Sequence, residues 1–68
     1  MAYTKDEIKL AAYNNTKLPD MDNDDSFLWS GMFYCYWWFR NRPGEQIEEC
    51  KELARCYEEF WEMRKGNQ

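Results

Sequence analysis

The stretch Phe27-Leu-Trp-Ser-Gly-Met-Phe-Tyr-Cys-Tyr-Trp-Trp-Phe39 decides the fold of this 68-residue chain. On a helix, with about 100° between successive side chains, it is apolar almost all round. Ser30, Tyr34 and Asn41 form the one modestly polar strip. A helix with this pattern is buried on most of its sides. We therefore predict a buried central helix over residues 26–40.

Three other structures fit this stretch less well. A transmembrane helix needs about 20 apolar residues, whereas this run is shorter and ends at Arg40. A single β-strand would have no partner strand in the chain. A helix that lies in a membrane interface is normally basic on its polar face, and this one is not. We expect no membrane association.

Helix signals also precede the central stretch. Thr4 and Glu7 have the spacing of a capping box, which predicts a short helix over residues 5–13. The short polar side chains at 14–16 compete with the backbone for its hydrogen bonds and end this helix. Leu18 stands before Pro19, so the linker is expected to be extended, with the Leu18 side chain against the body of the protein. The expected N-cap of the central helix is Asp24, Asp25 or Ser26.

Residues 45–65 predict a third, amphipathic helix that follows a turn at 41–44. Its apolar residues recur at alternating spacings of three and four, and its opposite face is rich in glutamate. Such a helix packs on a neighbour at a shallow angle. Gly66 is the expected C-cap. The apolar stripe consists of Ile47, Cys50, Ala54, Tyr57 and Trp61, widened by Leu53 and Phe60.

These elements predict an all-α fold in one domain, residues 1–68. A short N-terminal helix, an extended linker, an aromatic-rich central helix and a long amphipathic C-terminal helix pack as a helical hairpin. Aromatic residues make up 19% of the chain, and two short neighbours are not expected to cover so apolar a helix. We therefore expect a homo-oligomeric bundle. Its expected interface consists of Phe27, Leu28, Gly31, Met32, Cys35, Phe39, Tyr57 and Trp61.

Composition argues against several classes of function. The net charge of −4 gives no general attraction to duplex nucleic acid or anionic lipid. The three cysteines are an odd number with no signal peptide before them, so we expect a reducing cytoplasm and no disulfide framework. The chain has no histidine, the commonest general base, and no Ser or Cys has an evident activating partner. We predict that it is not an enzyme and needs no cofactor.

Two arrangements imitate metal sites, and both fail. The acidic run at 20–24 begins like a calcium loop, but Asp25 and Gly31 occupy the places of the required glycine and glutamate. Cys50 and Cys56 lie about 240° apart on the third helix, so they do not converge on zinc. We predict no metal site.

The segment at 36–42 combines rings with arginines at one helix end. Rings can stack on a nucleobase while guanidinium groups bind phosphate. The alternative is that the rings belong to the core and the arginines are solvated or paired with glutamates. The acidic face of the third helix likewise either imitates a phosphate backbone or keeps the protein soluble. The candidate ligand-binding residues are Tyr36, Trp37, Trp38, Arg40, Arg42, Lys51 and Arg55.

The opening Thr4-Lys-Asp-Glu-Ile-Lys-Leu-Ala-Ala-Tyr-Asn-Asn-Thr-Lys-Leu-Pro19 resembles that of small uncharacterised proteins encoded by phages and prophages of gut Firmicutes. In that family a short helix and an Asn-Asn/Leu-Pro linker also precede an aromatic helix and a charged C-terminal helix. Its members have a less aromatic middle helix and a more basic third helix. The resemblance implies expression in the bacterial host cytoplasm during infection, where such proteins often antagonise host defence by stoichiometric binding.

These observations lead to a non-catalytic phage-type binding protein that counters host immunity. The first expected partner besides a second copy of the chain is a cyclic nucleotide or related immune signal, held near Arg40 and Arg42, with Lys51 and Arg55 contributing across a subunit boundary. The alternative is an inhibitor that binds a host defence protein, for example as an acidic mimic of nucleic acid or an anti-CRISPR protein. A structural phage component is the third reading.

Overall fold

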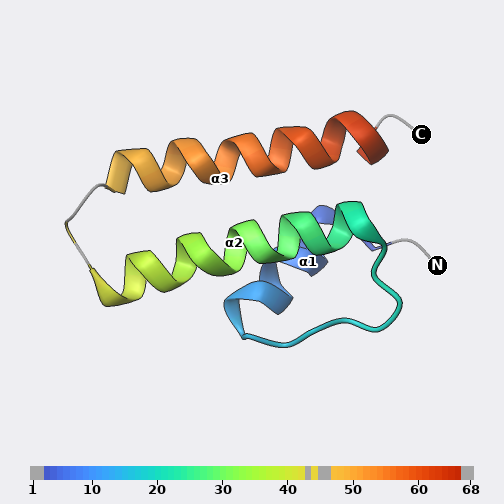
Figure 1. Cartoon of the computed structure of the whole chain (residues 1–68), viewed down its shortest axis with the longest axis horizontal. Helices are drawn as coiled ribbons and strands as arrows, with labels where there is room; N and C mark the ends of the chain where they lie inside the picture. Colours follow the sequence, from blue (N-terminus) through green and yellow to red (C-terminus); the bar gives the residue numbers. More distant parts are fainter. Residues whose placement is uncertain (1–2, 43, 45–46, 67–68) are drawn as a thin grey trace.

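The computed structural model describes residues 3–42, 44 and 47–66 of the chain. Its helices are α1 (Lys5–Tyr13), α2 (Asn23–Asn41) and α3 (Ile47–Trp61), and α3 continues into a π-helical turn, η1 (Glu62–Gly66). No described residue lies in a β-strand. In Figure 1, α2 and α3 run antiparallel as a hairpin, and α1 lies behind α2. The predicted all-α fold is confirmed.

Helix α1 begins where the capping box places it. The Glu7 amide donates to the Thr4 hydroxyl oxygen at 3.2 Å, and the Thr4 amide donates to a Glu7 carboxylate oxygen at 2.8 Å. These two bonds satisfy amide groups that have no partner inside the helix. The buried face of α1 carries Ile8, Ala11 and Ala12. The small alanines let α1 approach the hairpin closely.

The start of α2 differs from the prediction. Asp22 is the N-cap, and its carboxylate accepts the Asp25 amide at 2.9 Å, so the helix begins at Asn23 and not near Ser26. The candidates Asp24 and Asp25 therefore lie in the first turn, where their negative charge complements the helix dipole. The structure continues the helix to Asn41 at its other end, one residue beyond the predicted end.

The end of α3 is also corrected. The regular helix stops at Trp61, and residues 62–66 form the π-helical turn, so Gly66 does not cap a helix that runs through Lys65. Of the predicted turn at 41–44, Asn41 belongs to α2 and Arg42 is its C-cap. Gly44 has a φ of +88°, a backbone conformation that glycine adopts without strain. Pro43 lies outside the described residues.

The linker between α1 and α2 is fastened to the body of the protein. Leu18 packs against the core, as predicted. The Trp29 indole N–H donates to the Thr16 carbonyl at 2.9 Å, and the Lys17 ammonium lies 4.5 Å from the centre of the Trp29 ring. The Tyr3 hydroxyl donates to the Pro19 carbonyl. The linker thus closes one side of the core without regular structure.

The core lies between α1, α2 and the C-terminal half of α3. Leu28 and Met32 of α2 are inaccessible to solvent, together with Ile8 of α1. The expectation that neighbours in the same chain cannot cover the central helix is therefore wrong for this side, because α1 folds back over it. The buried cluster consists of Ile8, Ala11, Ala12, Leu28, Trp29, Met32 and Trp61.

Candidate functional site

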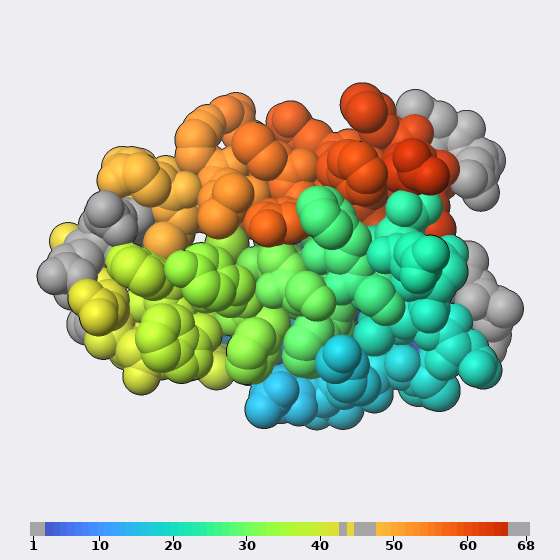
Figure 2. All heavy atoms as spheres, in the orientation of Figure 1, coloured from blue at the N-terminus to red at the C-terminus, as the bar shows by residue number. Residues whose placement is uncertain are grey.

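None of the described helices covers the side of the hairpin away from α1, and we call this side the open face. On α2 it consists of Phe27, Tyr34 and Trp38, and on α3 it consists of Leu53, Cys56 and Phe60; all six line two shallow hollows. Their spacings of three, four and seven place each set on one side of its helix. Figure 2 shows the two helices meeting along their length on this side.

Large apolar side chains on the open face are only partly covered. The exposed fraction is 45% for Phe27, 52% for Tyr34, 41% for Leu53 and 37% for Phe60, and it is 44% for Trp37 at the edge of the face. Single exposed apolar residues are ordinary, whereas a large contiguous group is typical of an interaction site. The open face is therefore the candidate site.

Ring contacts fix the shape of the open face. Phe27 contacts Tyr57 and Phe60, with ring centres 4.8 Å and 4.9 Å apart. Tyr34 contacts Trp38 at 6.2 Å. One hollow lies beside the first cluster and is lined by Phe27, Cys56, Tyr57 and Phe60. The second is lined by Tyr34, Trp38, Glu49, Cys50 and Leu53.

Most charged groups near the open face stand along its edges. On the α3 side, Glu52 and Glu59 are exposed, and Glu49 is part of the lining of the second hollow. An arginine lies on a ring at each end: the Arg42 guanidinium carbon is 5.2 Å from the centre of the Trp38 ring, and that of Arg64 is 5.6 Å from the centre of the Phe60 ring. The face is thus an apolar strip with one acidic long edge.

The residues predicted for an oligomer interface divide into two groups. Leu28, Met32, Cys35 and Trp61 are buried within a single chain, and Gly31 lies under the Tyr57 ring, so these five are corrected from interface to intrachain core. The reason is that α1 and α3 together cover this side of α2. Phe27 and Phe39 are exposed, and Tyr57 is half-buried.

The arginines predicted to bind a ligand are not brought together. The Arg40 guanidinium donates to the Tyr13 carbonyl at 2.6 Å and lies 4.1 Å from the centre of the Tyr13 ring, so it joins the end of α2 to α1. Arg42 lies on Trp38, on the open-face side of the helix. The two guanidinium groups therefore serve opposite sides of α2.

The cations of α3 contact glutamates of their own helix. Arg55 donates to the Glu52 carboxylate, with one contact of 2.6 Å, and both side chains are largely exposed. Lys51 lies 3.9 Å from a Glu48 carboxylate oxygen. Lys51 and Arg55 thus have acidic partners on α3, whereas Arg40 contacts Tyr13 and Arg42 contacts Trp38.

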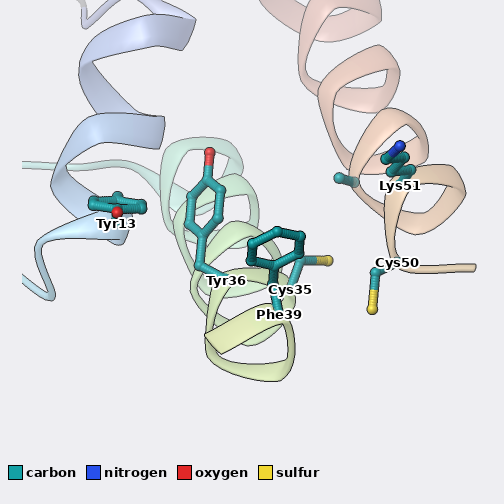
Figure 3. Close-up of a pocket in the computed structure, with 7 residues that line it drawn as sticks. Tyr13, Cys35, Tyr36, Phe39, Cys50 and Lys51 are labelled. Atoms are coloured by element: carbon teal, nitrogen blue, oxygen red, sulfur yellow. The ribbon is translucent and has the colours of Figure 1, made fainter. Parts of the chain in front are cut away.

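A second apolar site lies between the ends of α1, α2 and α3 (Figure 3). Its volume is about 240 Å3, and Tyr13 and Tyr36 meet edge to face at its mouth, with ring centres 5.3 Å apart. Cys35 points from α2 toward α3, and burial raises the pKa of its thiol to about 11. That thiol stays protonated at neutral pH. The cavity is lined by Tyr13, Cys35, Tyr36, Phe39, Cys50, Lys51 and Ala54.

The acidic run that imitates a calcium loop is occupied by contacts within the chain. Asp25 is 3% exposed, and its carboxylate accepts the Trp61 indole N–H at 2.8 Å and the Lys65 ammonium at 2.9 Å. Lys65 also donates to Asp22. Among the described residues, no group of three or more Cys, Asp and Glu side chains has the geometry to hold a metal ion.

Sequence reasoning missed part of the open face. The helical pattern places Tyr34 in the polar strip of the central helix and predicts that Leu53 and Phe60 widen the buried stripe. The apolar stripe on α3 is wider than packing against one neighbouring helix requires. That width is the sequence feature that could have indicated an exposed apolar face on α3. The Asp25–Trp61–Lys65 cluster was missed because an acidic run resembles a solvated lead-in.

Comparisons with protein families, with curated proteins and with solved structures found no match for this chain. The described helices include none whose length and apolar character would suffice to cross a membrane.

Proposed function

We propose that this protein is a non-catalytic binding protein that holds a helix of another protein against its open face. One observation carries the proposal: partly exposed apolar side chains of two packed helices form a continuous strip with two hollows. An amphipathic helix commonly binds in such a groove between helices, with its apolar side chains spaced by three and four residues as anchors.

Charge defines the partner helix further. Glu49, Glu52 and Glu59 follow the α3 edge of the open face, whereas Ser30 and Asn41 lie on the α2 edge. A helix with basic residues beside its apolar stripe would place them near the glutamates, which favours the correct orientation and faster association. The occupant that fits best is therefore a basic amphipathic helix.

The setting that we propose is a bacterial cytoplasm during phage infection, with a host defence protein as the partner. Support for this setting comes from the Thr4–Pro19 opening and its resemblance to small phage and prophage proteins. A stoichiometric inhibitor needs a binding surface and no reactive group, and the open face meets that need.

A cyclic nucleotide or related immune signal is the second candidate ligand. The observation in its favour is the apolar cavity beside Tyr13 and Tyr36, which has Lys51 in its lining. A base could stack on one of the rings that line the cavity while the ammonium group binds phosphate. The dispersal of Arg40, Arg42 and Arg55 makes this candidate weaker, since those residues could contribute only from a second copy.

A titration of the protein with two tryptophan-free peptides tests the binding mode. One peptide carries leucine and lysine at amphipathic helical spacing, and the other carries leucine and glutamate. We expect the lysine peptide to shift the emission of Trp37 and Trp38 to shorter wavelength, because it covers their rings, and to bind at least tenfold more tightly than the glutamate peptide. Equal binding of both peptides, or none, would contradict the proposal.

Two substitutions make that titration specific. Leu53→Lys places a charge on the open face, whereas Leu10→Lys places the same charge on the exposed side of α1. Only Leu53→Lys should weaken binding. In a bacterium that carries a phage-defence system, expression of the protein should restore plaque formation, and Leu53→Lys should remove the effect while Leu10→Lys keeps it. Restoration by both variants would assign the activity to another surface.

A thermal-shift screen with cyclic dinucleotides tests the second candidate. A ligand that binds the folded state alone raises the melting temperature, and the stabilisation grows with the logarithm of the ratio of its concentration to Kd. If the cavity is the site, Ala54→Leu should abolish the shift by filling it, while the peptide titration stays unchanged. A shift that survives Ala54→Leu would place nucleotide binding elsewhere.

A further inference from the structure

We propose that a second copy of this chain covers the open face until a partner binds, in a two-fold dimer with α2 of each copy against α3 of the other. The inference rests on the proposed function, since it concerns the same face, and it adds an occupant and a form of regulation. The dimer would keep the apolar strip from water and would have to dissociate before a partner helix could bind.

The apolar area fits a dimer interface. Phe27, Tyr34, Trp37, Leu53 and Phe60 are between 37% and 52% exposed. At about 200 Å2 for a large side chain, they present roughly 450 Å2 of apolar surface per copy. A standard interface buries about 800 Å2 per partner, and somewhat more than half of that area is apolar. The strip therefore supplies the apolar share of an interface of standard size.

Two-fold symmetry requires that one surface complement itself. When the helices of the two copies are aligned, two open faces can meet in two ways. An axis parallel to the helices places α2 against α3 of the second copy, whereas an axis across the helices places α2 on α2 and α3 on α3. The first arrangement keeps the ends in register, so that Phe27 of one copy meets Phe60 of the other.

The charges at the edges select the first arrangement. Glu52 and Glu59 lie on the outer edge of α3 and are both exposed, and with one arginine, Arg55, paired to Glu52, this edge keeps a net negative charge. With α3 on α3, these carboxylates would approach their counterparts in the second copy, and like charges at an interface disfavour it. With α2 against α3, the same carboxylates lie beside Ser30 and Asn41, which are exposed, neutral and polar.

Sedimentation equilibrium with three proteins tests whether the dimer forms through this face. We expect the unsubstituted protein to be a dimer at about 100 µM and increasingly monomeric on dilution, as micromolar affinity requires. Leu53→Lys should remain monomeric, and Leu10→Lys should dimerise like the unsubstituted protein. Circular dichroism on each sample shows that the helices persist. Tyr34→Lys repeats the test from α2, in case Leu53→Lys unfolds the chain.

A monomer at about 100 µM would overturn the dimer but leave the proposed function standing, because the peptide titration is carried out on dilute monomer. A dimer unaffected by both Leu53→Lys and Tyr34→Lys would overturn the assignment to the open face. If the dimer forms as proposed, the lysine peptide should dissociate it, and its apparent affinity should fall as the protein concentration rises.

Disulfide trapping tests the arrangement. Cys56 is exposed near the middle of the α3 stripe, and Ser30 lies at a similar height on the open side of α2. In a Cys50→Ser background, Ser30→Cys oxidised with diamide should form a disulfide to Cys56 of the second copy, which appears as a dimer on a non-reducing gel. Cys56 linked to Cys56 at comparable yield, without Ser30→Cys, would indicate α3 on α3 and overturn the proposed arrangement.

Discussion

Gly31 of α2 lies directly beneath the ring of Tyr57 in α3. A Cβ atom built on Gly31 would come within 2.5 Å of the ring carbons Cγ and Cδ1. These atoms belong to the part of the ring nearest the α3 backbone, so a small rotation of the side chain cannot move them away. This contact sets how closely α2 and α3 approach, and the two hollows of the open face lie on either side of it.

Replacing Gly31 by alanine should therefore destabilise the protein. On an unconstrained helix the change would stabilise by up to about 1 kcal/mol, but overpacking at Tyr57 should cost about 1–3 kcal/mol and reverse the sign. Urea denaturation followed by circular dichroism measures the difference. Ser30→Ala is the control, because Ser30 is exposed on the next position of the same helix and should change stability little. A more stable Gly31→Ala protein would refute the close contact.

The Trp61 indole N–H supports the buried carboxylate of Asp25. Trp61→Phe keeps a ring in the core but removes this donor, and a hydrogen bond to a charged group contributes about 1.5–3 kcal/mol. We expect a loss of stability in that range. The control is Trp37→Phe, since Trp37 is exposed at the edge of the open face. Equal losses in the two variants would show that ring size, not the hydrogen bond, is the cause.

Asp22 should make stability depend on acid pH. Hydrogen bonds from Lys65, and then from the Asp25 amide, hold the pKa of the Asp22 carboxyl below its ordinary value of 3.8. The stability that the ionised Asp22 carboxylate contributes is fully present above pH 3.8. It is lost as the pH falls through the lowered folded-state pKa. Asp22→Asn keeps an N-cap oxygen but removes the charge.

We therefore expect Asp22→Asn to be less stable than the unsubstituted protein at pH 7, and the difference to shrink as the pH falls below 3.8 and through the lowered folded-state pKa. Asp22→Ala, which lacks the cap as well, should lose about 1 kcal/mol more at either pH. Chemical denaturation at a series of pH values gives the curves. Parallel curves for the unsubstituted protein and Asp22→Asn would mean that Lys65 does not stabilise the carboxylate.

The cysteines should react with thiol reagents at very different rates. Cys56 is exposed, whereas Cys35 is buried and burial raises the pKa of its thiol to about 11. Because the thiolate is the reacting form, labelling at pH 8 should modify Cys56 first and Cys35 only after unfolding. Mass spectrometry of the labelled protein identifies the sites. Early modification of Cys35 would show that α1 and α3 do not cover it in solution.

Local signals predicted α1 well and the start of α2 less well. The Thr4–Glu7 capping box is complete within four residues, so the sequence contains all of its partners. The N-cap of α2 lies among several carboxylates that could each serve. Asp22 serves as the N-cap, and Lys65, near the other end of the chain, donates to both Asp22 and Asp25. No local sequence pattern shows these long-range contacts.

The existence of an exposed apolar face was predictable from the sequence, but its position was not. Aromatic richness correctly indicated more apolar surface than the core can hold. The prediction placed Leu28 and Met32 in the exposed apolar surface of an oligomer interface. It did so because helical spacing alone does not say which side of α2 the short helix α1 will cover. The candidate ligand site at 36–42 failed to converge for a related reason: successive residues of a helix point in different directions, and Arg40 turns toward α1.

The contacts that hold α1 against the hairpin indicate an order of folding. At nine residues, α1 is too short to persist alone in water, and it is tied to the hairpin near both ends, through Lys5 to Glu58 and Glu62 and through Tyr13 to Arg40. Its backbone amides should therefore exchange with deuterium earlier than those of the hairpin, and it should dock onto a hairpin that is already formed. A fluctuation that releases α1 would then uncover Leu28 and Met32 and leave the opposite side of the molecule unaltered.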